Sequence, residues 1–323
     1  MTARLLITRR LPEGALDPVA EAPDVEVVER SGDKPFTSAD LAAATATVDG
    51  IVSLITDRID AAVLAAGKGR LRVVANVAVG YDNIDVRAAT EAGVVVCNTP
   101  GMVEETTADL AFALILAASR RLSEAEADLR AGRWEGWEID QYLGRDIHGA
   151  TLGLVGYGGI GRAVARRAQG FGMEVLHHTR TPTGEPGWLG DLHELLARSD
   201  VVSLHVPLTA QTRHLIGRPE LAVMKPTAVL VNTARGPVVD EEAVAEALEE
   251  GRLFAAGLDV FEAEPAVHPR LLAAPRAVLT PHVGTASVAT RLAMARMAVR
   301  SSLAVLAGEL PDNALNPEAF HPR

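Results

Sequence analysis

Three side chains in this sequence could transfer a proton and bind an anion: Arg235, Glu264 and His282. Each comes shortly after a predicted apolar strand, at the end where ligands bind in an open α/β sheet. A guanidinium can hold a substrate carboxylate and polarise the adjacent carbonyl, while an imidazole can protonate the carbonyl oxygen as hydride reaches carbon. A carboxylate beside the imidazole favours its charged form and fixes its orientation. Together these side chains predict the reversible reduction of a 2-oxoacid.

A glycine-rich turn in the middle of the chain predicts a dinucleotide site. The apolar residues 152–155 form an expected buried strand, after which come Gly156, Gly158 and Gly161 and an alanine-rich helix expected over 162–169. The first glycine permits the tight turn, the second lets backbone approach a pyrophosphate, and the third lets helix and strand pack closely. Such glycines can also serve the turn alone, so the pattern needs support from elsewhere.

The segment after the next strand indicates which dinucleotide is bound. About 20 residues after the glycine turn, NAD-binding units usually offer an acidic side chain to the ribose 2′-hydroxyl. Thr179, Arg180 and Thr181 stand there instead, with no carboxylate. An arginine pairs with a 2′-phosphate, which a carboxylate would repel, although a solvated loop arginine is the plainer alternative. We therefore expect NADP(H) to be preferred and NAD(H) to be possible.

No metal site is expected. His177 and His178 are neighbours on one predicted strand, so their side chains point to opposite faces and make a poor pair of metal ligands. One of the two histidines could instead lie near the cofactor phosphate.

The order of the predicted elements indicates an α/β fold with two doubly wound parallel sheets. In the first part of the chain, strands are expected at 4–8, 25–29, 51–55, 73–75 and 94–97, and helices at 17–22, 38–44, 60–66 and 85–92. After the glycine turn, strands are expected at 175–178, 201–205, 228–232, 254–259 and 277–280, and helices at 191–197, 218–224 and 241–250.

A final helix expected over 288–306 decides the domain organisation. If this helix packs on the first sheet, the first domain is discontinuous in sequence. We therefore predict a flavodoxin-like substrate or catalytic domain made of residues 1–98 and 288–323. A Rossmann cofactor domain, residues 99–287, would be inserted between these two parts.

A long helix is also expected over 103–121, and its middle, residues 110–118, is apolar on nearly every face. Such a helix is covered on several sides, either within its own chain or by a second subunit. We expect a homodimer. Trp134 and Trp137 lie in the next segment, which shows little periodicity.

Charge and composition argue against several classes of partner. The net charge of −11 disfavours nucleic acid and anionic membranes. A single cysteine, Cys97, leaves no intrachain disulfide and favours a reducing, cytoplasmic location. We expect no signal peptide, and the apolar run at 108–118 is too short to span a bilayer.

Several motifs of the chain resemble those of the D-2-hydroxyacid dehydrogenases, along nearly its whole length. They lie at residues 76–85, 107–110, 205–208, 232–236 and 281–282. Arg235, Glu264 and His282 match the catalytic set of that family. The segment 179–181 is similar to the NADPH-type segment of its glyoxylate/hydroxypyruvate reductase branch. One departure is Gly159, where many members carry an arginine. The glycine lacks a side chain that could donate a hydrogen bond to the pyrophosphate of the cofactor.

The resemblance implies roles for further residues. The backbone at Val79 and Gly80 would bind the substrate carboxylate together with Arg235. Apart from the resemblance, the apolar side chains of Leu54, Val77 and Val79 predict a pocket lip that suits a short substrate. In some members a tryptophan of the partner subunit borders the substrate, and Trp137 matches it better than Trp134. The expected cofactor contacts are Thr107, Gly156, Gly158, Gly159, Ile160, Gly161, Thr179, Arg180, Thr181, His205, Pro207, Thr212, Thr233, Ala234, Asp259, His282 and Gly284.

The leading hypothesis is an NADPH-preferring reductase of glyoxylate and hydroxypyruvate that forms D-2-hydroxyacids. Other D-2-hydroxyacid dehydrogenases and phosphite dehydrogenase use the same scaffold and stay open as alternatives. Phosphoglycerate dehydrogenase is disfavoured because many of its members add a C-terminal regulatory domain, and formate dehydrogenase because a glutamine there replaces the carboxylate of Glu264. Nucleotide-sensing corepressors of this scaffold are a non-catalytic alternative, against which the chain offers no evident interaction tail.

Overall fold

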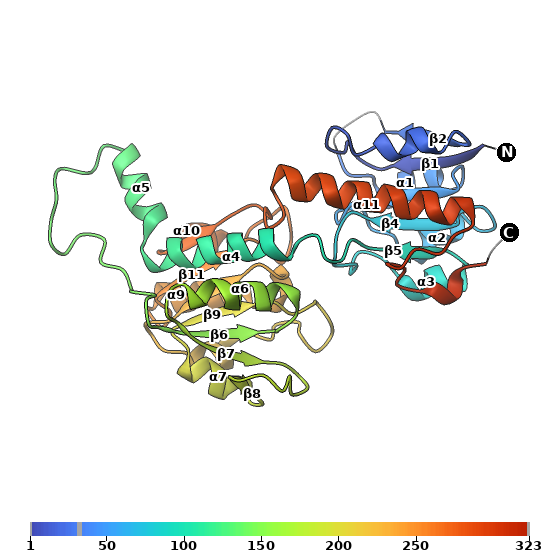
Figure 1. Ribbon diagram of the computed structural model, residues 1–323. Helices are drawn as coiled ribbons and strands as arrows, with labels where there is room; N and C mark the ends of the chain where they lie inside the picture. Colours follow the sequence, from blue (N-terminus) through green and yellow to red (C-terminus); the bar gives the residue numbers. More distant parts are fainter. Residues whose placement is uncertain (1, 31–33, 322–323) are drawn as a thin grey trace. The chain divides into compact units, whose positions relative to one another are not determined.

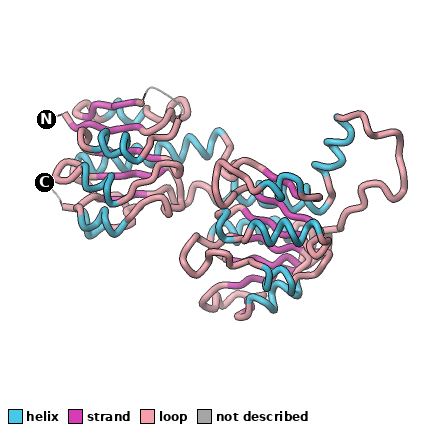
Figure 2. Tube along the Cα trace, turned by 180° about the vertical axis from the view of Figure 1, so that it is seen from behind, coloured by secondary structure: helices cyan, strands magenta, loops and turns pink. Residues whose placement is uncertain are grey.

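The computed structural model describes residues 2–30 and 34–321, and the chain divides into two compact units. Unit 1 comprises Met1–Val103 and Ala286–Arg323, and unit 2 comprises Glu104–Thr285 (Figures 1 and 2). The first boundary lies five residues beyond the expected residue 98. The residues after 98 pack into unit 1, since Thr99 is fully buried and its N–H donates to the carbonyl of Ala78 at 2.9 Å.

Unit 1 is built on a five-stranded parallel sheet with the strand order β2-β1-β3-β4-β5. The strands are β1 (Ala3–Ile7), β2 (Val25–Glu29), β3 (Gly50–Ser53), β4 (Val73–Asn76) and β5 (Val95–Cys97). This is the flavodoxin-like order of a doubly wound sheet. The sequence prediction of a parallel α/β sheet in this part of the chain is confirmed.

Neighbouring residues of these strands face opposite sides of the sheet, and helices cover both sides (Figure 1). Val74 of β4 packs with the helices of one face, whereas Val73 packs with the last helix. The first face carries α1 (Ser38–Thr45), α2 (Ala61–Ala66) and α3 (Val86–Glu91), and the second carries η1 (Asp17–Glu21) and α11 (Val288–Ala307). A short turn of 3-10 helix, η3 (Pro317–Ala319), lies near the end of the chain.

Side-chain caps explain where the helices of unit 1 begin. The Thr37 hydroxyl accepts a hydrogen bond from the N–H of Asp40 at the start of α1. Asp60 and Asp85 cap α2 and α3 in the same way. Each cap satisfies an N–H group that the helix itself leaves without a partner, so these helices begin where their capping residues stand in the sequence.

Unit 2 is built on a seven-stranded parallel sheet with the order β12-β11-β10-β9-β6-β7-β8. The strands are β6 (Thr151–Val155), β7 (Glu174–His178), β8 (Trp188–Leu189), β9 (Val201–Leu204), β10 (Val229–Asn232), β11 (Ala255–Leu258) and β12 (Ala277–Leu279). From β6 the chain adds β7 and β8 on one side of that strand, and then returns to add β9 on the opposite side of β6. This reversal of direction is the switch point of a Rossmann sheet. The two-residue strand β8 was not predicted, because it is too short for a periodic pattern.

Two layers of helices cover the sheet of unit 2. One layer contains α4 (Glu104–Ser119) and α6 (Gly159–Gln169). The other contains α7 (Leu192–Arg198), α8 (Arg218–Val223), α9 (Glu241–Glu249) and α10 (Pro269–Ala273). The apolar middle of α4 is largely covered within unit 2, where Ala111, Ile115 and Ala118 are buried at 0–1% exposure. Burial of this helix therefore does not require a second subunit.

The expectation of one helix over 103–121 was wrong at its C-terminal end. Helix α4 ends at Ser119, because Arg121 adopts the left-handed conformation with φ of 54°. This conformation is usually marked by a glycine in the sequence, and here it is not. A separate helix, α5 (Leu122–Arg130), follows and has no buried residue. Helix α6 begins at Gly159, three residues before the expected start.

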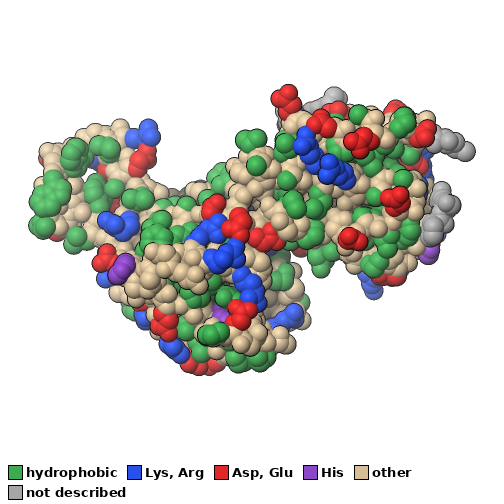
Figure 3. Space-filling model, in the orientation of Figure 1, with side chains coloured by type: hydrophobic (Ala, Val, Ile, Leu, Met, Phe, Trp, Pro, Cys, Tyr) green, Lys and Arg blue, Asp and Glu red, His purple; other side chains and the backbone are tan. Residues whose placement is uncertain are grey.

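Helix α5 and the following loop expose many large hydrophobic side chains, which gather there in Figure 3. Trp137 and Ile139 are each 77% exposed. The other large exposed hydrophobic residues of this segment are Leu122, Leu129, Trp134 and Leu143. We call this set the apolar arm. Contiguous exposed apolar surface of this kind commonly marks an interaction site.

Some negative findings apply to the described part of the chain. None of its helices has the length and apolar character needed to cross a membrane. Among residues 2–30 and 34–321, no group of three or more His, Cys, Asp or Glu side chains is placed to hold a metal ion. Cys97 is fully buried in β5, and burial raises the pKa of its thiol to about 12, so it serves as a small apolar core residue.

Candidate active site

His282 and Glu264 form a direct hydrogen-bonded pair. His282 Nδ1 lies 2.8 Å from Glu264 Oε2, and the other oxygen of Glu264 accepts the N–H of Phe261 at 3.0 Å. The imidazole is therefore held from its Nδ1 side, and Nε2 has no partner among the described residues. His282 also adopts a left-handed backbone with φ of 52°, which is uncommon outside glycine and typical of functional sites.

The charge state of Glu264 suits this pairing. Burial opposes ionisation of the carboxyl, but hydrogen bonds from His282 and Phe261 and the positive charges of His282 and Arg235 outweigh it and lower the pKa of Glu264. Glu264 is therefore a carboxylate at neutral pH. Its negative charge lies directly against Nδ1 of His282 and orients the ring.

Asp259 anchors the loop that carries His282. Its carboxylate accepts hydrogen bonds from the Thr280 hydroxyl at 2.7 Å and from the N–H groups of Val283 and Gly284 at 2.8 Å each. Its carbonyl accepts the N–H of His282, also at 2.8 Å. Burial raises the pKa of Asp259, against these hydrogen bonds. The sequence predicted Asp259 as a cofactor contact. In the structure, its hydrogen bonds hold the backbone of His282 and of the two residues after it.

Arg235 lies in a loop that packs tightly against the segment bearing Glu264. A Cβ atom on the next residue, Gly236, would stand 1.9 Å from the carbonyl carbon of Phe261, so only glycine fits there. Buried Asn232 holds the backbone of this loop, because its side chain donates to the carbonyl of Arg235 at 2.9 Å and accepts the N–H of Ala234 at 3.0 Å. Sequence reasoning missed this role of Asn232.

The glycine turn has three distinct environments. Gly156 has φ of +96°, and a Cβ there would lie 2.5 Å from the carbonyl oxygen of His205. A Cβ on Gly161 would lie 2.4 Å from the carbonyl oxygen of Gly156, so this glycine lets α6 approach the turn. A Cβ on Gly158 would meet no atom within 4 Å. The first and third glycines are thus required for packing, and the second faces open space at the N-terminus of α6.

The residues around this turn fit a bound dinucleotide. The N-terminus of α6 carries partly positive N–H groups beside the open space at Gly158, an arrangement that binds pyrophosphate. Two buried polar atoms in the residues that directly follow β9 and β10, His205 Nδ1 and Thr233 Oγ1, have no hydrogen-bond partner among the described residues. Burial lowers the pKa of His205 to about 4, so this side chain is neutral. A cofactor contact would satisfy such groups.

The segment after β7 is folded back on itself. The Thr179 hydroxyl donates to the carbonyl of Thr181 at 2.7 Å and accepts Trp188 Nε1–H at 3.1 Å. The side chain of Arg180 is exposed and has no ion pair among the described residues. Arg180 is therefore available to an external anion, as the NADP(H) expectation requires.

The two adjacent histidines have separate environments. His177 is buried, stacks on Tyr157 with ring centroids 3.8 Å apart, and pairs with the Thr183 hydroxyl at 2.7 Å. Burial lowers its pKa. His178 Nδ1 instead lies 3.0 Å from the carbonyl oxygen of Leu189.

The remaining predicted cofactor contacts belong to the same unit. Thr107 of α4 is buried and adjoins Gly284, whose Cβ would lie 3.5 Å from the Thr107 methyl group. The Thr212 hydroxyl donates to the carbonyl of Pro207 at 2.6 Å. Ile160 follows Gly159 in the first turn of α6. A side chain at position 159 would displace Glu104, since a Cβ there stands 2.6 Å from Glu104 Cγ.

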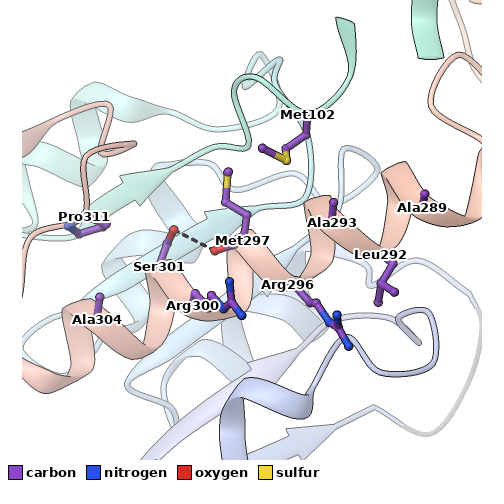
Figure 4. Close-up of a pocket in the computed structure, with 10 residues that line it drawn as sticks. All are labelled: Met102, Ala289, Leu292, Ala293, Arg296, Met297, Arg300, Ser301, Ala304 and Pro311. Carbon is purple, nitrogen blue, oxygen red and sulfur yellow. Dashed lines mark hydrogen bonds between the residues drawn. The ribbon is translucent and has the colours of Figure 1, made fainter. Parts of the chain in front are cut away.

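The predicted substrate contacts are divided between the units. Arg235 belongs to unit 2, while Leu54 follows β3 and Val79 and Gly80 follow β4 in unit 1. Trp137 belongs to the apolar arm and is exposed. Unit 1 also contains a cavity of about 640 Å³ along α11, between Met102 and Pro311 (Figure 4), which includes none of the predicted site residues.

Comparison with known proteins defines the family. The sequence profile for "D-isomer specific 2-hydroxyacid dehydrogenase, NAD binding domain" matches residues 112–284. The chain is 45% identical to a glyoxylate reductase of Thermococcus onnurineus over 100% of its own length and 98% of that protein. It is 46% identical to a glyoxylate reductase of Korarchaeum cryptofilum, with the same coverage.

Two solved structures are similar to this chain over nearly its whole length. The TT0316 protein from Thermus thermophilus is 48% identical and superposes with a TM-score of 0.91 over 97% of this chain and 99% of that one. An NADPH-dependent glyoxylate/hydroxypyruvate reductase from Sinorhizobium meliloti, in complex with NADP and malonate, is 36% identical, with a TM-score of 0.88 over 100% of this chain and 99% of that one.

The fold and the sequence thus define a class: the chain belongs to the D-isomer-specific 2-hydroxyacid dehydrogenase family. It is an NAD(P)-dependent oxidoreductase built from two parallel α/β units, of which unit 2 contains the dinucleotide-binding sheet.

Proposed function

We propose that this protein is an NADPH-preferring reductase that converts short 2-oxoacids, such as glyoxylate and hydroxypyruvate, to D-2-hydroxyacids. The observation that carries the proposal is the 2.8 Å pair between His282 and Glu264, in the same unit as Arg235 and the glycine turn. Reduction of a 2-oxoacid requires a proton donor, which an imidazole oriented by a carboxylate provides, and a cation that binds the substrate carboxylate. The names of the similar proteins support the same substrates.

In this mechanism the three side chains have different tasks. The glycine turn and the N-terminus of α6 would hold the dinucleotide, whose reduced nicotinamide would supply the hydride. Arg235 binds the substrate carboxylate and polarises the carbonyl group. His282 donates the proton on Nε2 to the carbonyl oxygen, and Glu264 stabilises the imidazolium before transfer and keeps the ring in place. In the oxidative direction, the neutral imidazole accepts the proton of the hydroxyl.

The NADPH preference is proposed on the exposed Arg180 and the absence of a carboxylate at the end of β7. Arg180→Asp should reduce the ratio of kcat/KM for NADPH to that for NADH by about 100-fold, since it removes a charge-assisted pair with the 2′-phosphate and adds repulsion. Steady-state kinetics with both cofactors measure the ratio. Arg213→Asp makes the same charge change at another exposed loop position and serves as the control. An unchanged ratio in Arg180→Asp would mean that this arginine does not contact the phosphate.

We further propose that the protein is a homodimer in which the apolar arm packs on a second copy. The exposure of Trp137, Ile139 and the other members of the arm supports an obligate partner of matching apolar surface. Sedimentation velocity distinguishes a 34.0 kDa monomer from a dimer. A Trp137→Ser, Ile139→Ser variant should shift the equilibrium towards monomer, and a wild-type protein that sediments as a monomer would contradict the proposal.

The function itself is tested with a panel of short 2-oxoacids and both reduced cofactors. The proposal expects absorbance loss at the NADPH band with glyoxylate and hydroxypyruvate, and weaker activity with 2-oxoacids that carry bulky side chains. Oxidation of phosphite by NADP⁺ without any 2-oxoacid reduction would favour the phosphite dehydrogenase alternative. Tight NADPH binding with no turnover of any compound would favour a nucleotide sensor.

A further inference from the structure

The loop after β4 in unit 1, residues 77–82, is held from the inside by its carbonyl groups. The carbonyl of Val79 accepts the side-chain N–H of Asn98 at 2.8 Å, and the carbonyl of Gly80 accepts the side-chain N–H of Asn76 at 3.0 Å. Both asparagines are buried, at 8% and 0% exposure. The carbonyl of Ala78 is held in the same way, by the N–H group of residue 99 at 2.9 Å.

These contacts fix the direction of the N–H groups. In a planar trans peptide, the carbonyl of one residue and the N–H of the next point in opposite directions. A carbonyl of Val79 directed at Asn98 therefore turns the N–H of Gly80 away from the interior. The bond to the carbonyl of Ala78 does the same for the N–H of Val79. Neither N–H has a partner among the described residues, and both residues are only partly buried.

A second layer ties this loop to the one that carries Leu54. Asn83 accepts the side-chain N–H of Asn76 at 3.1 Å and donates to the carbonyls of Leu54 at 3.2 Å and Asp57 at 2.9 Å. Asn76 also accepts the hydroxyl of Ser53 at 3.2 Å. The carboxyl ends of β3 and β4 are thus joined by side-chain amides.

Buried Asp57 fixes the far end of this arrangement. Its carboxylate accepts the N–H of Leu54 at 2.9 Å and the hydroxyl of Thr8 at 2.5 Å. All of these contacts are neutral-to-neutral or carboxylate-to-neutral hydrogen bonds that need no substrate to form. The loop is consequently organised before any ligand arrives.

We propose that Asn76, Asn83 and Asn98 are positioning residues of the substrate site, which aim the N–H groups of Val79 and Gly80 at the substrate carboxylate. The proposal rests on the proposed function, in which these two N–H groups bind that carboxylate. None of the asparagines needs to touch the substrate. Their effect is to place fixed dipoles, which cost no reorganisation when an anion binds.

The test compares three variants with equal losses of side-chain amide. Asn98→Ala removes the bond to the Val79 carbonyl, and Asn83→Ala removes the link between the two loops. Asn316→Ala is the matched control: Asn316 is buried in the same unit and makes three similar hydrogen bonds, but to Thr90, Val94 and Val96, away from the loop. All three variants should lower the melting temperature.

Only the two loop variants, Asn98→Ala and Asn83→Ala, should weaken substrate binding. We expect KM for glyoxylate to rise about 10-fold in Asn98→Ala and Asn83→Ala, which corresponds to the net loss of about one hydrogen bond. The Kd of oxalate for the NADPH complex, which requires no turnover, should rise by the same factor. The Kd of NADPH alone should stay within about two-fold of wild type, the scatter of a neutral substitution. Asn316→Ala should leave all three constants unchanged.

The outcomes separate this inference from the proposed function. If wild-type protein neither binds oxalate nor reduces any short 2-oxoacid, the proposed function fails. If wild-type protein does both, and the two loop variants keep wild-type KM and oxalate Kd while losing as much stability as Asn316→Ala, then the asparagines are structural only and the inference is overturned. Asn83→Ala provides an independent reading if Asn98→Ala does not fold.

Discussion

The two units each present backbone N–H groups at the carboxyl ends of a parallel sheet, but they build these sites differently. In unit 2, glycines let the chain turn sharply and α6 begins at once, so the N–H groups belong to a helix N-terminus. In unit 1, no helix begins at the loop 77–82, and side-chain amides hold the carbonyls inward instead. One site depends on the lack of side chains, the other on particular side chains.

Charge differs between the two regions as well. Arg235, Glu264 and His282 all belong to unit 2, whereas the predicted substrate loop of unit 1 offers uncharged peptide groups. If the proposed function holds, changes in unit 2 should alter catalysis and cofactor binding, and changes in the loop of unit 1 should alter substrate binding alone. The predictions below can break this division.

The largest effect is expected from Arg235→Ala. It should lower kcat/KM for glyoxylate by about 10³-fold, because a charge-assisted, two-point contact with the carboxylate and the polarisation of the carbonyl are both lost. Steady-state kinetics measure the loss, and NADPH binding should be unchanged. Arg252→Ala, which removes only an exposed pair with Glu250, is the control. Unchanged efficiency in Arg235→Ala would remove this residue from the mechanism.

The next largest effect is expected from Gly161→Ala. The added Cβ would lie 2.4 Å from a backbone oxygen of the turn, so α6 must move, and NADPH affinity should fall by about 100-fold. Fluorescence titration with NADPH measures the affinity. Gly170→Ala at the other end of α6, where the nearest atom would be 3.4 Å away, should bind normally. Equal affinities in the two variants would show that the close approach does not matter.

The smallest effect, and the sharpest, is expected from Glu264→Gln. The pKa of Glu264 is held below its ordinary value, so the carboxylate is ionised throughout the neutral range and favours imidazolium there. The substitution removes the negative charge beside the imidazole, so the basic limb of the pH–rate profile for reduction should move to lower pH, with a loss of about 10-fold at neutral pH.

Glu262→Gln is the matched control for this shift. Glu262 also pairs with a histidine, His214, at 3.0 Å, but not with His282. Its substitution should leave the limb in place. An unmoved limb in Glu264→Gln, or the same shift in both variants, would contradict the role of the pair.

Much of this site could be predicted because it depends on local sequence. The glycine turn is marked by three glycines at fixed spacing, and its strand and helix have clear apolar patterns. The strand ends that carry Arg235, Glu264 and His282 were placed to within a few residues. The absence of a carboxylate beside Arg180 was likewise a local observation.

The supporting contacts could not be predicted in this way. Asn232, Asn76 and Asn98 act through hydrogen bonds from side chain to backbone, whose partners depend on how the loops fold. Asparagine after a strand has no periodic signature that separates a brace from an ordinary turn residue. The end of α4 before Arg121 was missed for a related reason, because the residue type of an arginine does not indicate a left-handed backbone.

The central claim is that a hydride and a proton are added to a short 2-oxoacid to give the D-hydroxyacid. The most direct measurement is the product formed from hydroxypyruvate with NADPH deuterated at the transferable position of nicotinamide C4, analysed for configuration and label. The account predicts D-glycerate with one deuterium at C2. Formation of the L enantiomer, product without deuterium at C2, or no product at all would contradict it.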